Sequence, residues 1–300
     1  MFVFTLLNGT NSFIKGVIME IYHAVSTVKD SNIKVIKHLN NDEYGKIHEI
    51  INNINNFKKV YMATDDLISY LSKINTIIDE FDSGINYNLF VFNIKQAITG
   101  FLTAVRSYVD TFSHTLSSYY GKESNVYNTF EKEKRNAHSQ NESYKFIEEV
   151  RNYTQHRAFP ECNLVTKSID GKNHKLIMLS KHVLLKDKKF RSNRIPTEYV
   201  DKDDIDIVKH FIIMFGCLAM IHNIVINEVF ATTNFDEYFN LKEKYHEYVD
   251  HLCLTTFTSI NEKESILSIA SFDFNVIEAS LDSIKQSNEY LAKQKSCGAY

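Results

Sequence analysis

The sequence has 300 residues, 44% of them hydrophobic and 24% charged, and a formal net charge of −3 at pH 7. This balance excludes a disordered chain and is typical of a globular protein with a substantial core. With only 9 Gly and 2 Pro, the chain argues against a β-sandwich, a β-barrel or a Gly-rich nucleotide-binding fold.

The predicted elements begin with an ambiguous stretch over residues 1–40, in which residues 13–28 fit either a strand or a short helix. From residue 42 to about 61, apolar residues recur every three or four positions, which predicts a helix. A second helix follows to about residue 80, starting at acidic residues after Thr64. The clearest helix covers residues 87–120, where one face is apolar throughout.

Beyond residue 120, the period of the pattern changes twice. Residues 122–140 form a polar helix or loop, and a helix over residues 141–156 must end before Pro160. Residues 163–187 alternate as in a β-hairpin with a tight turn at Asp170-Gly171. The remaining apolar patterns predict helices near residues 203–230, 235–252 and 274–292.

The pattern as a whole predicts an all-α protein, a helical bundle with one small inserted β-hairpin. We expect two parts: a helical extension over residues 1–82, packed on a helical domain over residues 83–300 that carries the hairpin at about 163–187.

The cysteines and the N-terminal residues favour a cytoplasmic location. The first 13 residues lack the basic start and the apolar core of a signal peptide. The longest apolar run, residues 211–221, is too short to cross a bilayer. We therefore expect no membrane partner and no cofactor, and free thiols at the four cysteines, Cys162, Cys217, Cys253 and Cys297.

A polar motif, Arg151-Asn152-Tyr153-Thr154-Gln155-His156, closes the helix over residues 141–156. At about 100° per residue, Asn152 and His156 stack on the polar side, and Arg151 and Gln155 lie between them and the apolar stripe. These side chains point away from the core of their own helix. Catalysis needs a second wall that excludes water, and a second copy of the same protein is the simplest source of one.

The residue types of this motif suit cleavage of a phosphodiester. Attack by an RNA 2′-hydroxyl requires proton transfer, for which histidine is the best side chain near neutral pH. Negative charge developing on the phosphoryl group requires fixed cationic donors, which a guanidinium supplies. His156 would act as general acid or base, Arg151 would stabilise the phosphorane, and Asn152 would position them.

The spacing of Arg151, Asn152 and His156 at the end of a helix resembles the R-x4-6-H signature of the HEPN superfamily (higher eukaryotes and prokaryotes nucleotide-binding domains). The resemblance covers about residues 86–230. It implies a metal-independent endoribonuclease that acts on RNA as a homodimer with a composite active site. It also implies the role of a toxin or an antiviral, abortive-infection effector, with a neutralising antitoxin or a sensor as a further partner.

Other residues are weaker candidates for the same site. Arg106 and Asp110 lie four residues apart on the flank of the helix over residues 87–120. They form either an exposed ion pair or part of the cleft, where they would contact phosphate. Gln155 is a further possible cleft residue. One basic stretch follows the motif and represents either a solvated loop or an RNA-binding surface. Its cationic residues are Lys172, Lys175, Lys181, Lys186, Lys188, Lys189, Arg191 and Arg194.

Two patterns resemble known motifs but have the wrong spacing. His246 and His251 are five apart, which places them about 140° apart on a helix, unlike the zinc-binding H-E-x-x-H. Arg135 and His138 are too close together for the R-x4-6-H signature. We therefore expect no metal site.

The sequence leaves two functions of different classes open, besides a weaker third one, a metal-dependent enzyme using His246 and His251. The first is the metal-independent endoribonuclease. The alternative is a non-catalytic interaction or nucleotide-binding module of the same fold, in which Arg151 and His156 make only the ordinary polar contacts of a helix end.

Overall fold

The computed structural model describes residues 19–30, 32–81, 86–157, 159–169, 172–260 and 263–296. The chain divides into two compact units. Unit 1 combines residues up to 58 with residues from 233 onward, and unit 2 comprises residues 59–232. This division differs from the boundary expected at residue 82, because both ends of the chain belong to the same unit.

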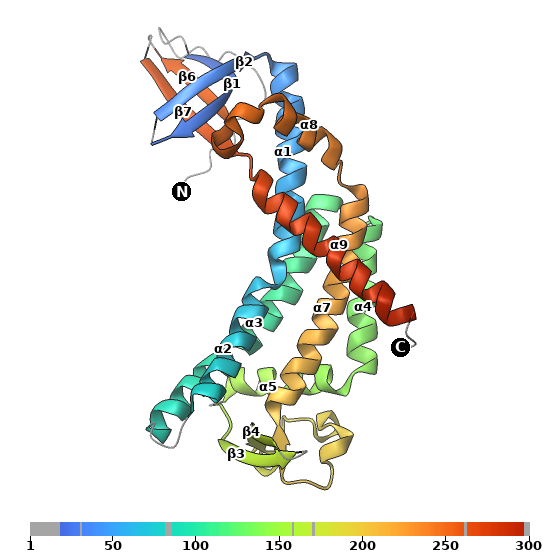
Figure 1. The fold of residues 1–300 in the computed structure, drawn as a ribbon. Coiled ribbons are helices and arrows are strands. Elements are labelled where there is room, and N and C mark those ends of the chain that lie inside the picture. The colour runs from blue at the N-terminus through green and yellow to red at the C-terminus, as the bar shows by residue number, and fades with distance from the viewer. Residues whose placement is uncertain are drawn as a thin grey trace. The chain divides into compact units, whose positions relative to one another are not determined.

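Unit 1 is built around an antiparallel sheet with the strand order β2-β1-β6-β7 (Figure 1). Two similar segments contribute to it, each a β-hairpin followed by a helix. The first contains β1 (Met19–Lys29), β2 (Asn32–Leu39) and α1 (Asn41–Tyr61), and the second contains β6 (Leu252–Ile260), β7 (Lys263–Ser271) and α9 (Phe274–Ser296). Before β6 come α8 (Phe235–Lys244) and a 3-10 helix, η4 (His246–His251).

The central pair of this sheet joins residues that are far apart in the chain. His23 of β1 lies opposite Thr256 of β6, and its Nδ1 is 3.1 Å from the Thr256 hydroxyl. Residues 252–258 of β6 are all buried, and they are β-branched threonines and apolar residues, as suits a strand covered on both faces.

The expectation of an all-α fold is therefore wrong. The described chain contains seven strands in two antiparallel sheets, so the protein mixes helices and sheets. The helix expected over residues 235–252 also ends early, because η4 and then β6 follow α8.

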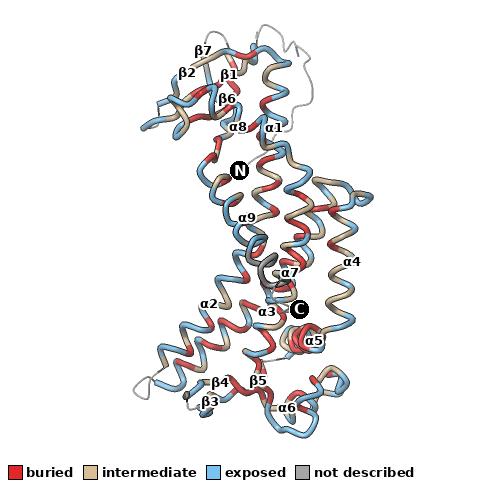
Figure 2. The backbone as a smooth tube through the Cα atoms, turned by 45° about the vertical axis from the view of Figure 1, so that its right-hand side comes forward, coloured by how far each residue is buried: buried red, intermediate tan, exposed pale blue. Residues whose placement is uncertain are grey.

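Unit 2 is mainly helical. Its α-helices are α2 (Asp65–Glu80), α3 (Tyr87–Tyr120), α4 (Asn125–Gln140), α5 (Glu142–His156), α6 (Lys181–Lys186) and α7 (Ile207–Thr232). Short 3-10 helices are η1 (Met62–Thr64), η2 (Ser192–Arg194) and η3 (Thr197–Tyr199). Buried residues recur along α3 as red segments in Figure 2, consistent with its predicted apolar face.

The predicted hairpin is present and belongs to a three-stranded antiparallel sheet. Its strands are β3 (Cys162–Ile169) and β4 (Lys172–Ser180), and a short third strand, β5 (Asp204–Asp206), pairs with β4. The turn expected at Asp170-Gly171 lies outside the described residues. Cys162, Cys217 and Cys253 are free thiols, and Cys297 also lies outside the described residues.

Local sequence explains where the helices next to the candidate site begin and end. The Asn86 and Asn141 side chains cap α3 and α5 by accepting hydrogen bonds from backbone N–H groups of their first turns. Gly121 ends α3 with φ 84°, a conformation that glycine adopts without strain. Within α3, a Cβ added to Gly100 would collide with the ring of Tyr70, so this glycine permits α2 to approach closely.

α7, which is more apolar in composition than the longer α3, has ten buried residues and packs against α4 and α5. By length and composition α7 also qualifies as a membrane-spanning helix, a test that the core helix of a soluble protein passes equally well.

Candidate functional site

A pocket of about 360 Å³ lies between α3 and α5, and it brings together four of the predicted site residues. These are Arg106 and Asp110 from α3, and Arg151 and Gln155 from α5. The rest of the wall is mainly hydroxyl-bearing, with Thr99, Thr103, Ser107 and Thr154.

Of the two arginines of this pocket, Arg106 forms an ion pair with a carboxylate, and Arg151 bonds a side-chain amide. Arg106 Nε lies 2.5 Å from Asp110 Oδ2, one helical turn away. Arg151 Nη1 donates a hydrogen bond of 3.1 Å to Asn152 Oδ1. Both guanidinium groups keep donors without a protein partner among the described residues, so the pocket is prepared to bind an anion.

Electrostatics around Arg151 support the same conclusion. Burial lowers the pKa of Arg151, and the nearby positive charge of Arg106 lowers it further, while Asp110 and Glu148 act in the opposite direction. Two like charges held near one pocket repel each other, and a bound phosphate would relieve that repulsion.

The other two motif residues do not line this pocket. At about 100° per residue, Asn152 lies about 100° and His156 about 140° around α5 from Arg151. Both side chains are exposed, and His156 forms no hydrogen bond or ion pair with any residue that the structure describes. Asn152 therefore orients Arg151 rather than His156.

A loop on the far side of His156 is fastened to α5 by a buried carboxylate that sequence reasoning missed. Glu149 is 4% exposed. Its Oε1 accepts a hydrogen bond of 3.1 Å from the Arg191 backbone N–H, and its Oε2 accepts one of 2.8 Å from Arg191 Nε. The local sequence around Glu149 contains no signal for this contact, because Arg191 lies 42 residues later in the chain.

Two further contacts hold the same loop. Arg157 Nε donates a hydrogen bond of 2.9 Å to Asp187 Oδ2. The rings of Tyr153 and Phe190 pack edge to face, with centroids 6.2 Å apart. The backbone N–H of Lys189 and the Arg157 guanidinium lower the pKa of the Asp187 carboxyl.

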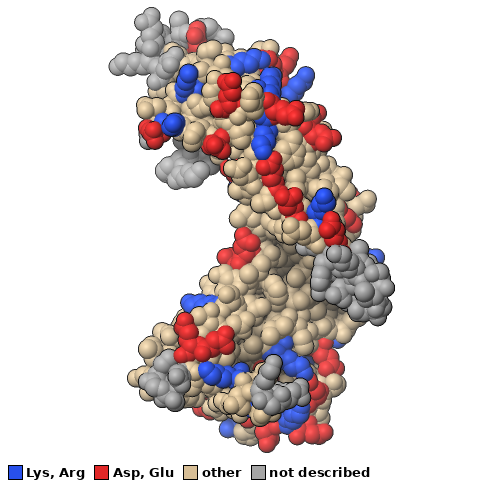
Figure 3. Space-filling model, in the orientation of Figure 1, with Lys and Arg blue, Asp and Glu red and all other residues tan. Residues whose placement is uncertain are grey.

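The predicted basic stretch divides into structural and free residues. Lys175 bonds the Phe81 carbonyl, and Lys181 Nζ donates to the Val200 carbonyl at 2.7 Å. The side chains of Lys186, Lys188 and Lys189 are exposed, Arg194 is half-buried, and Lys172 begins β4. Figure 3 shows Lys and Arg side chains gathered over the lower part of unit 2, with acidic side chains among them.

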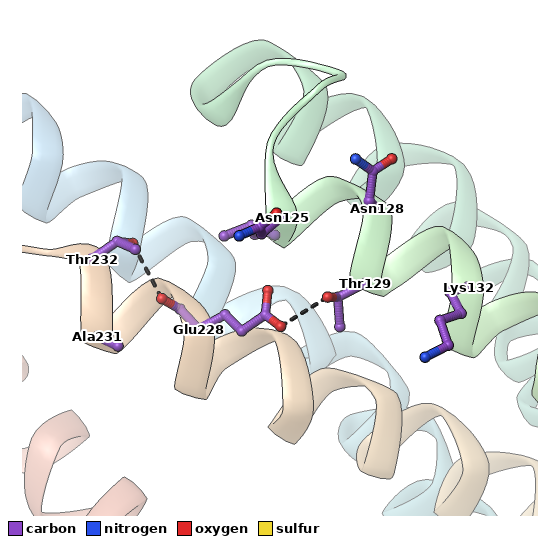
Figure 4. A pocket seen from close by; sticks show the side chains of 8 residues that line it. Asn125, Asn128, Thr129, Lys132, Glu228, Ala231 and Thr232 are labelled. Atoms are coloured by element: carbon purple, nitrogen blue, oxygen red, sulfur yellow. Dashed lines mark hydrogen bonds between the residues drawn. The ribbon is translucent and has the colours of Figure 1, made fainter.

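A second pocket in unit 2, of about 440 Å³, lies between α4 and α7 (Figure 4). Lys132 and Glu228 are its charged residues, and Glu228 Oε1 accepts a hydrogen bond of 2.8 Å from Thr129. One cation against one carboxylate gives no excess of positive charge, so this pocket is a poorer anion site than the one between α3 and α5.

The two histidines considered as possible metal ligands lie outside unit 2. His246 and His251 lie on η4 in unit 1, and both side chains are exposed. Within the described residues, no three His, Cys, Asp or Glu side chains gather as metal ligands would.

Comparisons with protein-family models, with curated proteins and with solved structures find no match to this chain. The resemblance to the HEPN superfamily thus rests on the motif residues of α5 alone.

Proposed function

We propose that this protein is a metal-independent endoribonuclease whose site is the C-terminal end of α5. The observation that carries the proposal is the pairing of Arg151 and Arg106 at one pocket, with an exposed histidine, His156, ending the same helix. Arginines bind the phosphate and stabilise the charge that develops on it, and histidine exchanges protons near neutral pH.

The reaction is an internal transfer that needs no external water. The RNA 2′-oxygen attacks phosphorus, the bond from phosphorus to the 5′-oxygen breaks, and a 2′,3′-cyclic phosphate and a 5′-hydroxyl result. A base removes the 2′-hydroxyl proton, and an acid protonates the leaving 5′-oxygen. His156 fills one of these roles, and Arg151 holds the phosphoryl oxygens.

Geometry favours a site shared by two copies of the chain. Arg151 and His156 lie about 140° apart around α5, so they do not converge from one helix onto one phosphate. In a homodimer, Arg151 of one copy and His156 of the other would meet across the interface.

The test is cleavage of a labelled RNA in EDTA by wild-type protein, Arg151→Ala and His156→Ala. Each variant should lose about 100-fold or more in rate, and the products should carry cyclic phosphate and 5′-hydroxyl ends. Arg135→Ala and His246→Ala are matched controls, because both side chains are exposed and neither residue belongs to α5. Loss of cleavage in EDTA, or 5′-phosphate ends, would contradict the proposal.

Mixing the two inactive variants tests the shared site. If Arg151 and His156 come from different copies, a mixed dimer has one intact site, so about one quarter of the wild-type activity should return. No recovery on mixing, with dimers confirmed by sedimentation, would place both residues in the same copy.

The alternative, a non-catalytic nucleotide-binding module, has one observation in its favour. The pocket contains both arginines but not His156. This function predicts that His156→Ala binds a mononucleotide as well as wild type does, and that Arg151→Ala binds it more weakly. It also predicts that the wild type and both variants fail to cleave RNA.

A further inference from the structure

Residues 187–191, which we call the strip, follow the C-terminal half of α5 and are fixed to it at three points. The residues that hold the strip are Glu149 and Tyr153 of α5 and Arg157, the residue directly after the helix, each four positions from the next. Residues at this spacing lie one above another on a helix, so the strip runs along α5 rather than crossing it.

The strip also has a fixed backbone of its own. Asp187 Oδ1 accepts a hydrogen bond of 2.9 Å from the Lys189 backbone N–H. The Asp187 carbonyl accepts one of 2.9 Å from the Phe190 backbone N–H, and the Phe190 side chain is buried. Asp187 therefore has two tasks, which are to close this turn and to anchor it to Arg157.

Lys188 and Lys189 occupy the exposed part of the turn. Their side chains have no hydrogen bond or ion pair within the part of the chain that the structure describes. By contrast, the two arginines that take part in the contacts between the strip and α5, Arg157 and Arg191, both form ion pairs. The turn thus presents two free ammonium groups from a rigid support.

Around α5, the strip and the pocket are on different sides, and the motif lies between them. Taking Arg151 as zero and about 100° per residue, Asn152 and His156 lie at about 100° and 140°, and the strip contacts begin at about 160° with Glu149. A chain of phosphates that starts at Arg151 and crosses Asn152 and His156 arrives at the strip.

Resting on the proposed function, we infer that the strip is the second phosphate-binding wall of the site and that the substrate is single-stranded RNA lying across α5. An α-helix with its side chains is about 10 Å wide, so the path between Arg151 and Lys188 is longer than one phosphate. A mononucleotide would occupy the pocket alone, and only an oligonucleotide would reach the strip.

The first test measures binding of a labelled single-stranded RNA to His156→Ala protein in EDTA at several salt concentrations. Each phosphate contact contributes about 0.7 to the slope of log affinity against log salt for single strands. Lys188→Ala combined with Lys189→Ala should reduce that slope by about 1.4 and leave binding of adenosine monophosphate unchanged. Lys122→Ala with Lys132→Ala, exposed lysines of the same unit, should change neither.

The second test separates a positioned wall from a merely charged loop. Asp187→Asn removes a negative charge, so a loop that acts only through charge would bind RNA more tightly. A wall that depends on its anchor would bind RNA several-fold more weakly, because the single amide oxygen of Asn cannot replace both carboxylate oxygens and therefore loses either the Arg157 contact or the turn hydrogen bond. Tighter or unchanged binding by Asp187→Asn overturns the inference, as does an unchanged salt slope after removal of the two lysines.

Failure of this inference is distinguishable from failure of the catalytic proposal. Binding is measured with a His156→Ala protein, so it requires no cleavage. If wild-type protein does not cut RNA but removal of the two lysines still lowers the salt slope, RNA binding by the strip is supported and the catalytic proposal is wrong. If wild-type protein cuts RNA and removal of the two lysines does not change the salt slope, the catalytic proposal is supported and RNA binding by the strip is wrong.

Discussion

On the pocket side of α5, Asp110 forms an ion pair with Arg106, and Arg151 has no ion pair among the described residues, whereas on the strip side Arg157 and Arg191 each have a carboxylate partner. The first arrangement leaves positive charge without a partner, and the second uses charge to hold a loop in place. The arginines around α5 therefore serve two purposes, and the partners of each arginine indicate which purpose it serves.

The largest effect is expected on the third, buried side of α5, where Ser143 and Phe146 pack against His210. Burial lowers the pKa of His210 to about 4, and burial does the same for His222 elsewhere in unit 2. The unfolded chain takes up these protons near the ordinary value of 6.5. Stability is therefore fully present above pH 6.5 and is lost as the pH falls toward 4.

The size of that loss follows from the two pKa values. The difference of about 2.5 between the unfolded pKa of 6.5 and the folded pKa of about 4, at about 1.4 kcal/mol per pH unit, gives about 3 to 4 kcal/mol for each histidine. Urea unfolding followed by circular dichroism at pH 7.5 and 4.5 measures it. His210→Gln should flatten the pH dependence by about half, and the exposed His246→Gln should not. A free energy of unfolding that is constant over this range would contradict the role of burial.

Arg191→Ala should have the next largest effect. It leaves the Glu149 carboxylate buried without its ion pair, and breaking such a pair from one side costs about 3 kcal/mol, the low end of the usual range because Arg191 is half exposed. The free energy of unfolding at pH 7 is the measurement. Asn193→Ala, an exposed neighbour, is the control. A loss below about 1 kcal/mol would mean that Glu149 finds another partner.

Asp110→Asn should strengthen anion binding on the pocket side. With the Asp110 carboxylate gone, Arg106 loses its ion pair and the pocket lining loses its negative charge, so inorganic phosphate should bind about fivefold more tightly, as expected for one exposed charge. Titration calorimetry measures the change, with Asp201→Asn as a control on the surface of the same unit. Weaker binding would show instead that Asp110 is needed to position Arg106.

The smallest effect on stability is expected for Arg157→Ala. Like Arg191→Ala, this substitution removes one of the ion pairs that hold the strip. Arg157 is 54% exposed, and such surface pairs contribute less than about 1 kcal/mol. Comparing unfolding of the two variants sharpens the contrast between a contact that stabilises the fold and one that positions a loop. Equal losses from both would remove that contrast.

Helices with an apolar face were predictable from the sequence because each carries its own periodic signal. The expected helix over residues 87–120 is found as α3, and the one over residues 141–156 is found as α5 from Glu142 to His156. The hairpin at β3 and β4 was also visible, since its strands are neighbours in the chain. In these cases a short stretch of sequence contains the whole reason for the structure.

The sheet of unit 1 was not predictable in this way. β1 pairs with β6 across more than two hundred residues, so no local pattern shows that pairing, although each of these strands also pairs with its neighbour in the chain, β2 or β7. Alternating threonines such as Thr256 and Thr258 were a usable signal for a strand, but His246 and Glu247 just before them had suggested a continuing helix. Likewise, Glu149 gave no sign that a loop forty residues later would be bonded to it.

The pairing of β1 with β6 also sets the order in which the chain is able to fold during its synthesis. All of unit 2 has been made by residue 232, whereas the strand that completes the central pair of unit 1 begins at residue 252. Until then β1 and β2 form a two-stranded ribbon with an open edge, which is marginal in water and prone to pair with other chains. Unit 2 is thus synthesised in full before its companion sheet can close, and the open edge of β1 is able to pair with other chains for as long as translation of unit 2 takes.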